Sequence, residues 1–296
     1  MEKLKKCNLC PHTCNVDRMS GKVGRCKVKD KVKVALVSVH NFEEPPISGT
    51  KGSGTIFFSG CNLNCVYCQN HDISSGGFGK EISIERLAKI MLEQEQRGVH
   101  NINLVTPTIY VEHIKEAIKI AKGKGLSIPI VYNSSGYESL ETLKSLEGYI
   151  DIYLPDFKYY FDELGEEYSK VKNYSKYAKA ALIEMRRQVE DNIDKEGIMK
   201  TGLIVRHLIL PGTIENSKKV ITWIRDNLGK DTIISVMAQY FPTYKAKEHP
   251  KLNRKITKQE LEEIKEYIYD LDMTGYIQEL SDYEEEYVPE FNLDNV

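Results

Sequence analysis

The sequence predicts an α/β fold built on a mostly parallel sheet, and three observations support this prediction. Six short apolar runs alternate with helix-forming segments after about residue 52. Runs that are apolar on both faces are typical of parallel strands covered by helices on both sides, and successive βα units favour right-handed crossovers. The chain has 296 residues, 41% of them hydrophobic and 28% charged, which allows one large domain with a small appendage or two medium domains.

The expected strands and helices follow from local patterns. Apolar side chains repeat with helical spacing in residues 111–121 and 216–228, and a capping-box pattern precedes a third helix at 257–271. The stretch 157–174 has no clear pattern, and a loop of that length is usually a binding loop or a lid. The expected strands are residues 55–59, 102–106, 127–132, 149–154, 203–210 and 232–237.

Two architectures fit these units: an open doubly wound sheet, or a barrel with fewer than eight strands. A closed eight-stranded barrel typically takes about 250 residues for eight βα units, and this chain has six. In either architecture the functional site belongs at the carboxyl ends of the strands.

The charge pattern excludes some functions. A net charge of −2 gives no overall attraction to nucleic acid or anionic lipid. Basic residues gather in 1–33 and acidic residues in 279–296, where solvated faces or tails are expected. No apolar run is long enough for a membrane span and no signal-like stretch follows Met1. We therefore expect a cytoplasmic protein, in which clustered cysteines indicate metal or redox chemistry rather than disulfides.

Three of the seven cysteines lie in the stretch GCNLNCVYCQN, residues 60–70, directly after the first expected strand. Cys61, Cys65 and Cys68 are one ligand short of a closed four-ligand site. Three thiolates on a [4Fe–4S] cube leave the fourth iron open to a ligand. A structural zinc site that borrows His71, or three packed thiols, are the alternatives.

This C-x3-C-x2-C spacing, with Tyr67 before the last cysteine, resembles the radical S-adenosylmethionine (SAM) superfamily, and the flanking residues resemble its pyruvate formate-lyase activating enzyme branch. The resemblance covers about residues 52–280. It implies a partial (β/α)6 barrel over 51–296, with residues 1–50 as a Cys-rich extension and an acidic C-terminal segment. It also implies SAM bound to the open iron and cleaved reductively to a 5′-deoxyadenosyl radical.

The resemblance implies roles for polar residues at the strand ends. Asp156 and Lys158 match an Asp-x-Lys pair near SAM and substrate, and are the expected catalytic residues. Arg206 is expected to bind the SAM carboxylate, with a neighbouring Asp or Glu as the alternative partner. The family's GGE-like turn is replaced by VTPT, and turn chemistry is the alternative for the strand-end Asn and Ser. The expected cofactor-binding residues are Tyr67, Thr106, Thr108, Asn133, Ser134, Arg206 and Gln239.

Four more cysteines form an N-terminal cluster: Cys7, Cys10, Cys14 and Cys26. Four thiolates so close together suit a closed metal site, and the uneven spacing slightly favours a second [4Fe–4S] cluster over zinc. Basic residues around a metal site also occur in nucleic-acid-binding proteins, but residues 1–41 contain no Phe, Tyr or Trp for base stacking. A docking surface for an acidic partner or electron donor fits as well.

The leading hypothesis is an oxidoreductase of the radical SAM type that abstracts a hydrogen atom from a glycine of a glycyl-radical enzyme, with flavodoxin or ferredoxin as electron donor. A radical SAM enzyme acting on a small molecule or peptide is the first alternative. A metal-stabilised binding module without catalysis is the second.

Overall fold

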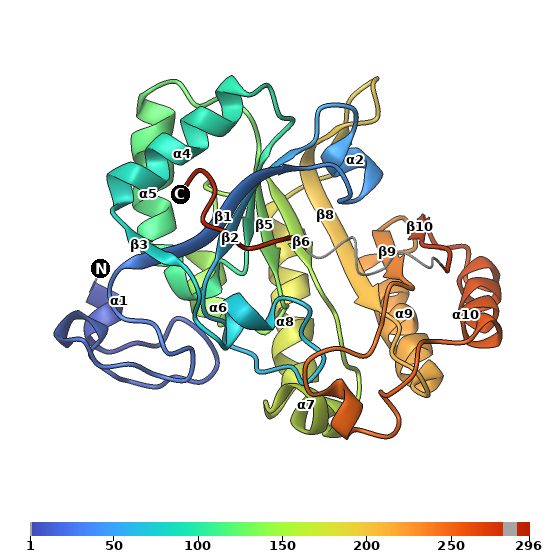
Figure 1. Cartoon of the computed structure of the whole chain (residues 1–296). Helices are drawn as coiled ribbons and strands as arrows, with labels where there is room; N and C mark the ends of the chain where they lie inside the picture. The colour runs from blue at the N-terminus through green and yellow to red at the C-terminus, as the bar shows by residue number, and fades with distance from the viewer. Residues whose placement is uncertain (1, 281–288) are drawn as a thin grey trace.

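The computed structural model describes residues 2–280 and 289–296, and its centre is one sheet (Figure 1). The strands lie side by side in the order β10-β9-β8-β6-β5-β4-β2-β1-β3, with β7 paired to β8. Their bounds are β1 (Val32–His40), β2 (Ser53–Phe58), β3 (Lys80–Ile82), β4 (Ile102–Val105), β5 (Ile130–Ser134), β6 (Ile152–Pro155), β7 (Asn192–Ile193), β8 (Met199–Leu208), β9 (Ile233–Met237) and β10 (Gly275–Ile277).

Helices connect the parallel strands. Figure 1 shows α4 and α5 at one end of the sheet and α9 and α10 at the other. The helices are α1 (Glu2–Lys5), α2 (Pro45–Ser48), α3 (His71–Ser74), α4 (Ile84–Gln96), α5 (Val111–Gly123), α6 (Leu140–Lys144), α7 (Asp162–Ser169), α8 (Tyr174–Gln188), α9 (Ile214–Leu228) and α10 (Lys258–Asp270).

The α/β prediction is confirmed. Strands β2, β4, β5, β6, β8 and β9 pair in parallel with their neighbours in chain order, and each overlaps an expected strand. The terminal strands β10 and β3 do not pair with each other within the described residues, so the six-unit sheet is a partial barrel. No helix in residues 2–280 or 289–296 is long and apolar enough to cross a bilayer.

The predicted helix patterns fold as expected because each has one apolar face. In α5, Val111, Ile114 and Ile118 are almost fully buried, and burying such side chains contributes about 1.5–3 kcal/mol each. The capping box of α10 is present: Glu260 N donates to Thr257 Oγ1 at 3.1 Å, and Thr257 N donates to Glu260 Oε2 at 2.8 Å.

Three segments add structure that the local patterns did not indicate. Strand β1, from the expected N-terminal extension, pairs antiparallel with β2 and joins the sheet. The stretch 157–174 contains α7, and its end holds the cysteine loop: Ser169 O accepts from Asn64 N at 3.1 Å and Tyr168 O from Val66 N at 2.8 Å. Part of the acidic C-terminal segment, residues 281–288, lies outside the described residues. Beyond it, Leu293 N donates to Ala35 O of β1 at 3.0 Å.

Candidate active site

A cavity of about 620 Å³ lies at the carboxyl ends of the parallel strands, where parallel α/β folds place their ligands. Its wall combines the three-cysteine loop, the ends of β4, β5, β6, β8 and β9, and the turn between β1 and α2. Its volume falls within the range of about 300–1,000 Å³ that is usual for small-molecule and cofactor pockets.

The three-cysteine loop is fixed by contacts with neighbouring segments. It begins at Gly60, whose φ of +85° suits glycine, and a Cβ there would lie 2.7 Å from Val28 Cγ2 and 3.1 Å from Cys26 O. The Cys65 thiol lies 2.9 Å from Ser169 Oγ, and the Cys68 thiol lies 3.3 Å from Ser74 Oγ. The loop is therefore held from both sides before any metal binds.

The thiols of this loop fit an iron–sulfur cluster. Cys61, Cys65 and Cys68 are each partly exposed, and Cys65 and Cys68 border the cavity. Burial raises the pKa of Cys65 to about 11, and the charge of Lys158 opposes that rise. No three His, Cys, Asp or Glu side chains of residues 2–280 and 289–296 converge on a single ion. A cube does not require such convergence, because its thiolates bind different iron atoms.

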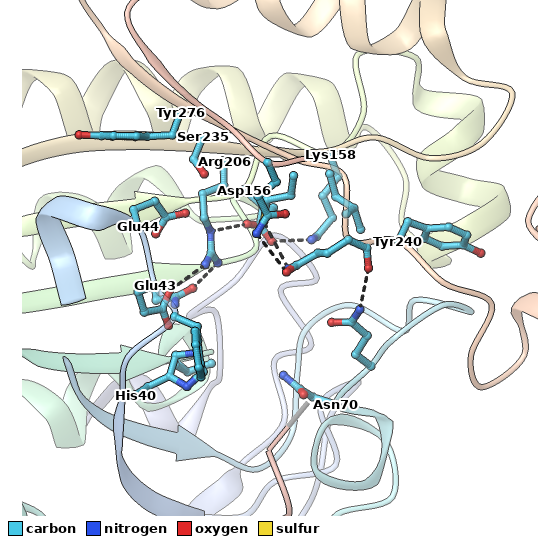
Figure 2. A pocket seen from close by; sticks show the side chains of 18 of the residues that line it. His40, Glu43, Glu44, Asn70, Asp156, Lys158, Arg206, Ser235, Tyr240 and Tyr276 are labelled. Carbon is cyan, nitrogen blue, oxygen red and sulfur yellow. Dashed lines mark hydrogen bonds and ion pairs between the residues drawn. The ribbon is translucent and has the colours of Figure 1, made fainter. Parts of the chain in front are cut away.

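A chain of charged side chains crosses the cavity wall, as Figure 2 shows. Arg206 Nε donates to Asp156 Oδ1 at 3.0 Å, and Arg206 Nη1 lies 3.4 Å from Glu43 Oε2. The other Asp156 oxygen accepts from Lys158 Nζ. Burial alone raises the pKa of Asp156, but Lys158 and Arg206 together bring it below its ordinary value. Arg206 thus has acidic partners from its own chain, the alternative that the sequence left open.

The structure brings most of the expected site residues to this cavity. Tyr67 lies in its wall, and its hydroxyl oxygen is 2.5 Å from that of Tyr159. The Tyr159 hydroxyl in turn lies 2.8 Å from Ser169 Oγ, the same oxygen that contacts the Cys65 thiol. This path ties the aromatic residue of the motif to the cysteine loop. The expected residues that line the cavity are Cys65, Tyr67, Cys68, Asn133, Asp156, Lys158, Arg206 and Gln239.

Other expected residues lie elsewhere. Thr108 is buried and donates its hydroxyl to Glu138 Oε1 at 2.7 Å, so this hydroxyl is used within the fold. Ser134 Oγ accepts from Gly136 N at 3.3 Å, a turn contact. Thr106 is outside the cavity wall and has φ +61°, a left-handed conformation that is uncommon for threonine and concentrates at functional sites.

Sequence reasoning missed one wall of the cavity, the turn that carries His40, Glu43 and Glu44. Asn103 Nδ2 donates to Glu43 Oε1 at 3.0 Å and holds it against Arg206. Two adjacent glutamates followed by two prolines, in the stretch NFEEPPIS, were the available signal. Paired carboxylates beside rigid, apolar residues indicate an ordered turn rather than a solvated one.

The four N-terminal cysteines lie next to the three-cysteine loop but do not line the cavity. His12 Nε2 contacts Asn62 O at 2.7 Å, and Cys26 O faces Gly60. Burial raises the pKa of Cys10 to about 12. Arg18 is fully buried between these cysteines and η2 (Thr108–Tyr110), with Nη1 at 4.0 Å from Cys7 Sγ and 2.8 Å from Ile109 O.

Comparison with known proteins assigns the family. The model of the radical SAM superfamily matches residues 55–224, which is more than half of the chain and includes the cysteine loop, Asp156, Lys158 and Arg206. The chain belongs to the radical SAM superfamily. The resemblance read from the motif is thereby confirmed, and the family implies a [4Fe–4S] cluster and SAM.

The chain is also similar to individual proteins of other organisms. It is 35% identical to an uncharacterized protein, MJ0674, of Methanocaldococcus jannaschii, over 91% of this chain and 76% of that one. It is 25% identical to a pyruvate formate-lyase-activating enzyme of Clostridium pasteurianum, over 62% of this chain and 72% of that one.

A solved structure of Streptococcus suis SuiB bound to S-adenosylmethionine has the same fold, with a TM-score of 0.52 and 13% identity over 79% of this chain. The radical SAM chain described here spans about half the length, 51%, of that protein.

Proposed function

We propose that this radical SAM enzyme cleaves SAM reductively in the cavity and takes a hydrogen atom from a glycine of a partner protein, as an activating enzyme for a glycyl-radical enzyme. The observation that carries the proposal is that the thiols of Cys65 and Cys68 open on the same cavity as Asp156, Lys158 and Arg206. Similarity to the activating enzyme of C. pasteurianum supports a protein substrate. With SAM and one electron, the products are methionine, 5′-deoxyadenosine and a substrate radical.

The residues of the cavity have distinct tasks in this proposal. Cys61, Cys65 and Cys68 would hold the cluster, which with SAM supplies the one-electron chemistry when bound. Lys158 favours negative charge at the thiols, because its charge opposes the rise that burial causes in the pKa of all three. Asp156 holds Lys158 and Arg206 in place through one carboxylate oxygen each. Burial of Tyr67 and Tyr240 excludes water from the wall between them.

We also propose a second metal site at Cys7, Cys10, Cys14 and Cys26. Arg18 supports it: a fully buried guanidinium needs an anionic partner, its Nη2 has no hydrogen-bond partner within the described residues, and thiolates on a metal would supply the charge. The basic residues around this site suit an acidic electron donor of the flavodoxin or ferredoxin kind. Metal analysis of the variant without Cys61, Cys65 and Cys68 distinguishes a second iron–sulfur cluster from zinc.

The proposed function is tested by anaerobic loading with iron and sulfide, followed by SAM and dithionite, with 5′-deoxyadenosine measured by mass spectrometry. We expect the nucleoside from the intact protein and none from the Cys61→Ala, Cys65→Ala, Cys68→Ala variant. Electron paramagnetic resonance on a co-purified partner then tests for the glycyl radical. A loaded cluster that yields no nucleoside contradicts the proposal, and a colourless protein with zinc at these cysteines favours the binding module.

A SAM-dependent nucleoside without any protein radical favours the other radical SAM hypothesis, a small molecule or peptide as substrate. The charged wall of the cavity is the observation that supports this second candidate, because ionic side chains suit a polar ligand.

A further inference from the structure

The acidic turn, Glu43 and Glu44 between β1 and α2, has no task in the proposed function. Both carboxylates border the cavity, and Figure 2 shows them on one side of Arg206, with Lys158 and Tyr240 on the other. Buried carboxylates without full compensation are costly, so a pair of them facing a cavity requires an explanation.

Glu44 is not explained by a structural role. It occupies the N-cap position of α2, yet its side chain makes no capping hydrogen bond. Only 8% of the residue is exposed, and Ser235 contacts its carboxyl group. The second carboxyl oxygen, Oε2, has no hydrogen-bond partner within the described residues. A buried, unpartnered acceptor in a cavity wall points to a ligand that donates to it.

The charges around the cavity leave room for one more cation. Among the described residues that line the cavity, the carboxylates of Glu43, Glu44 and Asp156 face two cations, Lys158 and Arg206. His40 does not add a third, since burial lowers its pKa below the ordinary value. Burial raises the pKa of both glutamates although Arg206 opposes that rise, which means that Arg206 does not fully compensate them.

Different cations of the protein serve the two ends of the cavity. The charge of Lys158 acts on the three thiols, whereas the charge of Arg206 acts on the two glutamates. Asp156 bonds both cations and lies between these two ends. If SAM itself occupied the glutamate end, it would displace a cationic probe from the cavity, and the titration with saturating SAM described below tests this.

We infer that Glu43 and Glu44 form the substrate-recognition end of the cavity, with Glu44 Oε2 accepting a hydrogen bond from a positively charged group of the substrate, an alkylammonium or guanidinium. This inference rests on the proposed function for the identity of the cavity as the active site. If the inference holds, the substrate, whether a peptide or a small molecule, carries a positively charged group near the hydrogen atom that is abstracted.

Equilibrium binding to the full-length, cluster-loaded protein tests the inference without any radical chemistry. The probes are acetyl-Gly-Lys-amide and its neutral isostere acetyl-Gly-norleucine-amide, titrated by calorimetry with and without saturating SAM. We expect the lysine peptide to bind at least about tenfold more tightly than the norleucine peptide, since charge-assisted hydrogen bonds are the stronger class. Saturating SAM should leave this preference in place.

Glu44→Gln keeps the shape of the side chain and should abolish the preference, and Glu43→Gln should reduce it. Glu184→Gln makes the same change at a buried carboxyl of α8 outside the cavity wall and should retain it. Equal affinity for the two peptides, a preference that survives in Glu44→Gln, or displacement of the lysine peptide by SAM overturns the inference. The assay for 5′-deoxyadenosine remains separate, so failure of either proposal is recognised by itself.

Discussion

The three-cysteine loop and the four-cysteine leader, residues 7–26, touch each other but surround their thiols differently. Two thiols of the loop border a cavity of about 620 Å³ with ionised groups on its far wall. In the leader, the Cys7 thiol lies 4.0 Å from Nη1 of the buried Arg18, and Cys7 and Cys10 are buried while Cys14 and Cys26 are partly exposed. The first arrangement leaves access for a ligand, whereas the second buries two of its four cysteines.

The two regions also use a buried arginine differently. Arg206 contacts two carboxylates, Asp156 and Glu43, and so belongs to a network that ligand binding can rearrange. Arg18 donates to the carbonyls of Lys29 and Ile109, and its Nη1 lies 4.0 Å from Cys7 Sγ. The comparison teaches that the arginine near the loop thiols is held by other side chains, whereas the arginine of the leader is held by backbone carbonyls.

The largest expected effect separates the two regions directly. Replacing Cys61, Cys65 and Cys68 by alanine should lower 5′-deoxyadenosine formation by more than about 100-fold. Changing residues that only contact metal ligands already costs up to about 100-fold in activity, and this variant removes the ligands themselves. Replacing Cys7, Cys10, Cys14 and Cys26 by serine should instead lower Tm by about 4 °C or more, since each kcal/mol lost shifts Tm by about 2–4 °C in chains of 150–250 residues. Mass spectrometry of 5′-deoxyadenosine measures the first effect, and calorimetry measures the second. An unchanged Tm in the leader variant would show that these four cysteines do not stabilise the fold.

The buried arginines provide the second test. Arg206→Met removes the cation that contacts Asp156 and Glu43 and should destabilise the protein by about 3–5 kcal/mol. Arg18→Met leaves backbone carbonyls without donors and should cost about 1–3 kcal/mol, more with metal in the leader than after chelation. Urea denaturation with and without chelator gives these values. If chelation makes no difference to Arg18→Met, the thiolates are not its partner.

Gly60, where the regions meet, gives a smaller effect. An alanine Cβ would press on Val28 and on Cys26 O, whereas at Gly77, which also has positive φ, nothing lies within 4 Å. Both substitutions place a residue with a side chain at a positive φ, so this cost is common to the two variants. Gly60→Ala should therefore lower the free energy of unfolding by about 1–3 kcal/mol more than Gly77→Ala, which is the cost of overpacking. Denaturation and iron content after reconstitution measure the difference. Equal costs would show that the leader and the loop are not tightly packed.

The smallest effects concern the hydroxyls beside the loop thiols. Ser169→Ala removes the group that joins Tyr159 to Cys65 and should cost about 1–2 kcal/mol, because the buried tyrosine loses a partner. Ser74→Ala beside Cys68 should cost about 0.5 kcal/mol, the low end for a single hydrogen bond, since Ser74 is only partly buried. The two variants are compared by denaturation without the cluster. A larger loss of unfolding free energy in Ser74→Ala than in Ser169→Ala would contradict the hydrogen-bonded path Tyr67–Tyr159–Ser169.

Much of the fold and the centre of the site could be predicted from the sequence because these features are local. A run of buried apolar residues marks each parallel strand, and the cysteine spacing lies within eight residues. The acidic turn was missed because its meaning depends on distant partners: Glu43 meets Arg206 across 163 positions of the chain. The hydroxyl of Thr108, which the sequence suggested for the cofactor, is donated to Glu138. No local pattern shows which way such a side chain points.

Strand β1 has a practical consequence for work with shortened chains. It leads from the leader at Val32 to the acidic turn after His40, and it covers the edge of β2, which is buried along its whole length. A chain that begins at residue 51 would present β2 as a bare edge strand, a template for aggregation. Its insolubility would then report a missing neighbour in the sheet rather than a missing metal, so a shortened chain intended to stay in solution should begin before Val32.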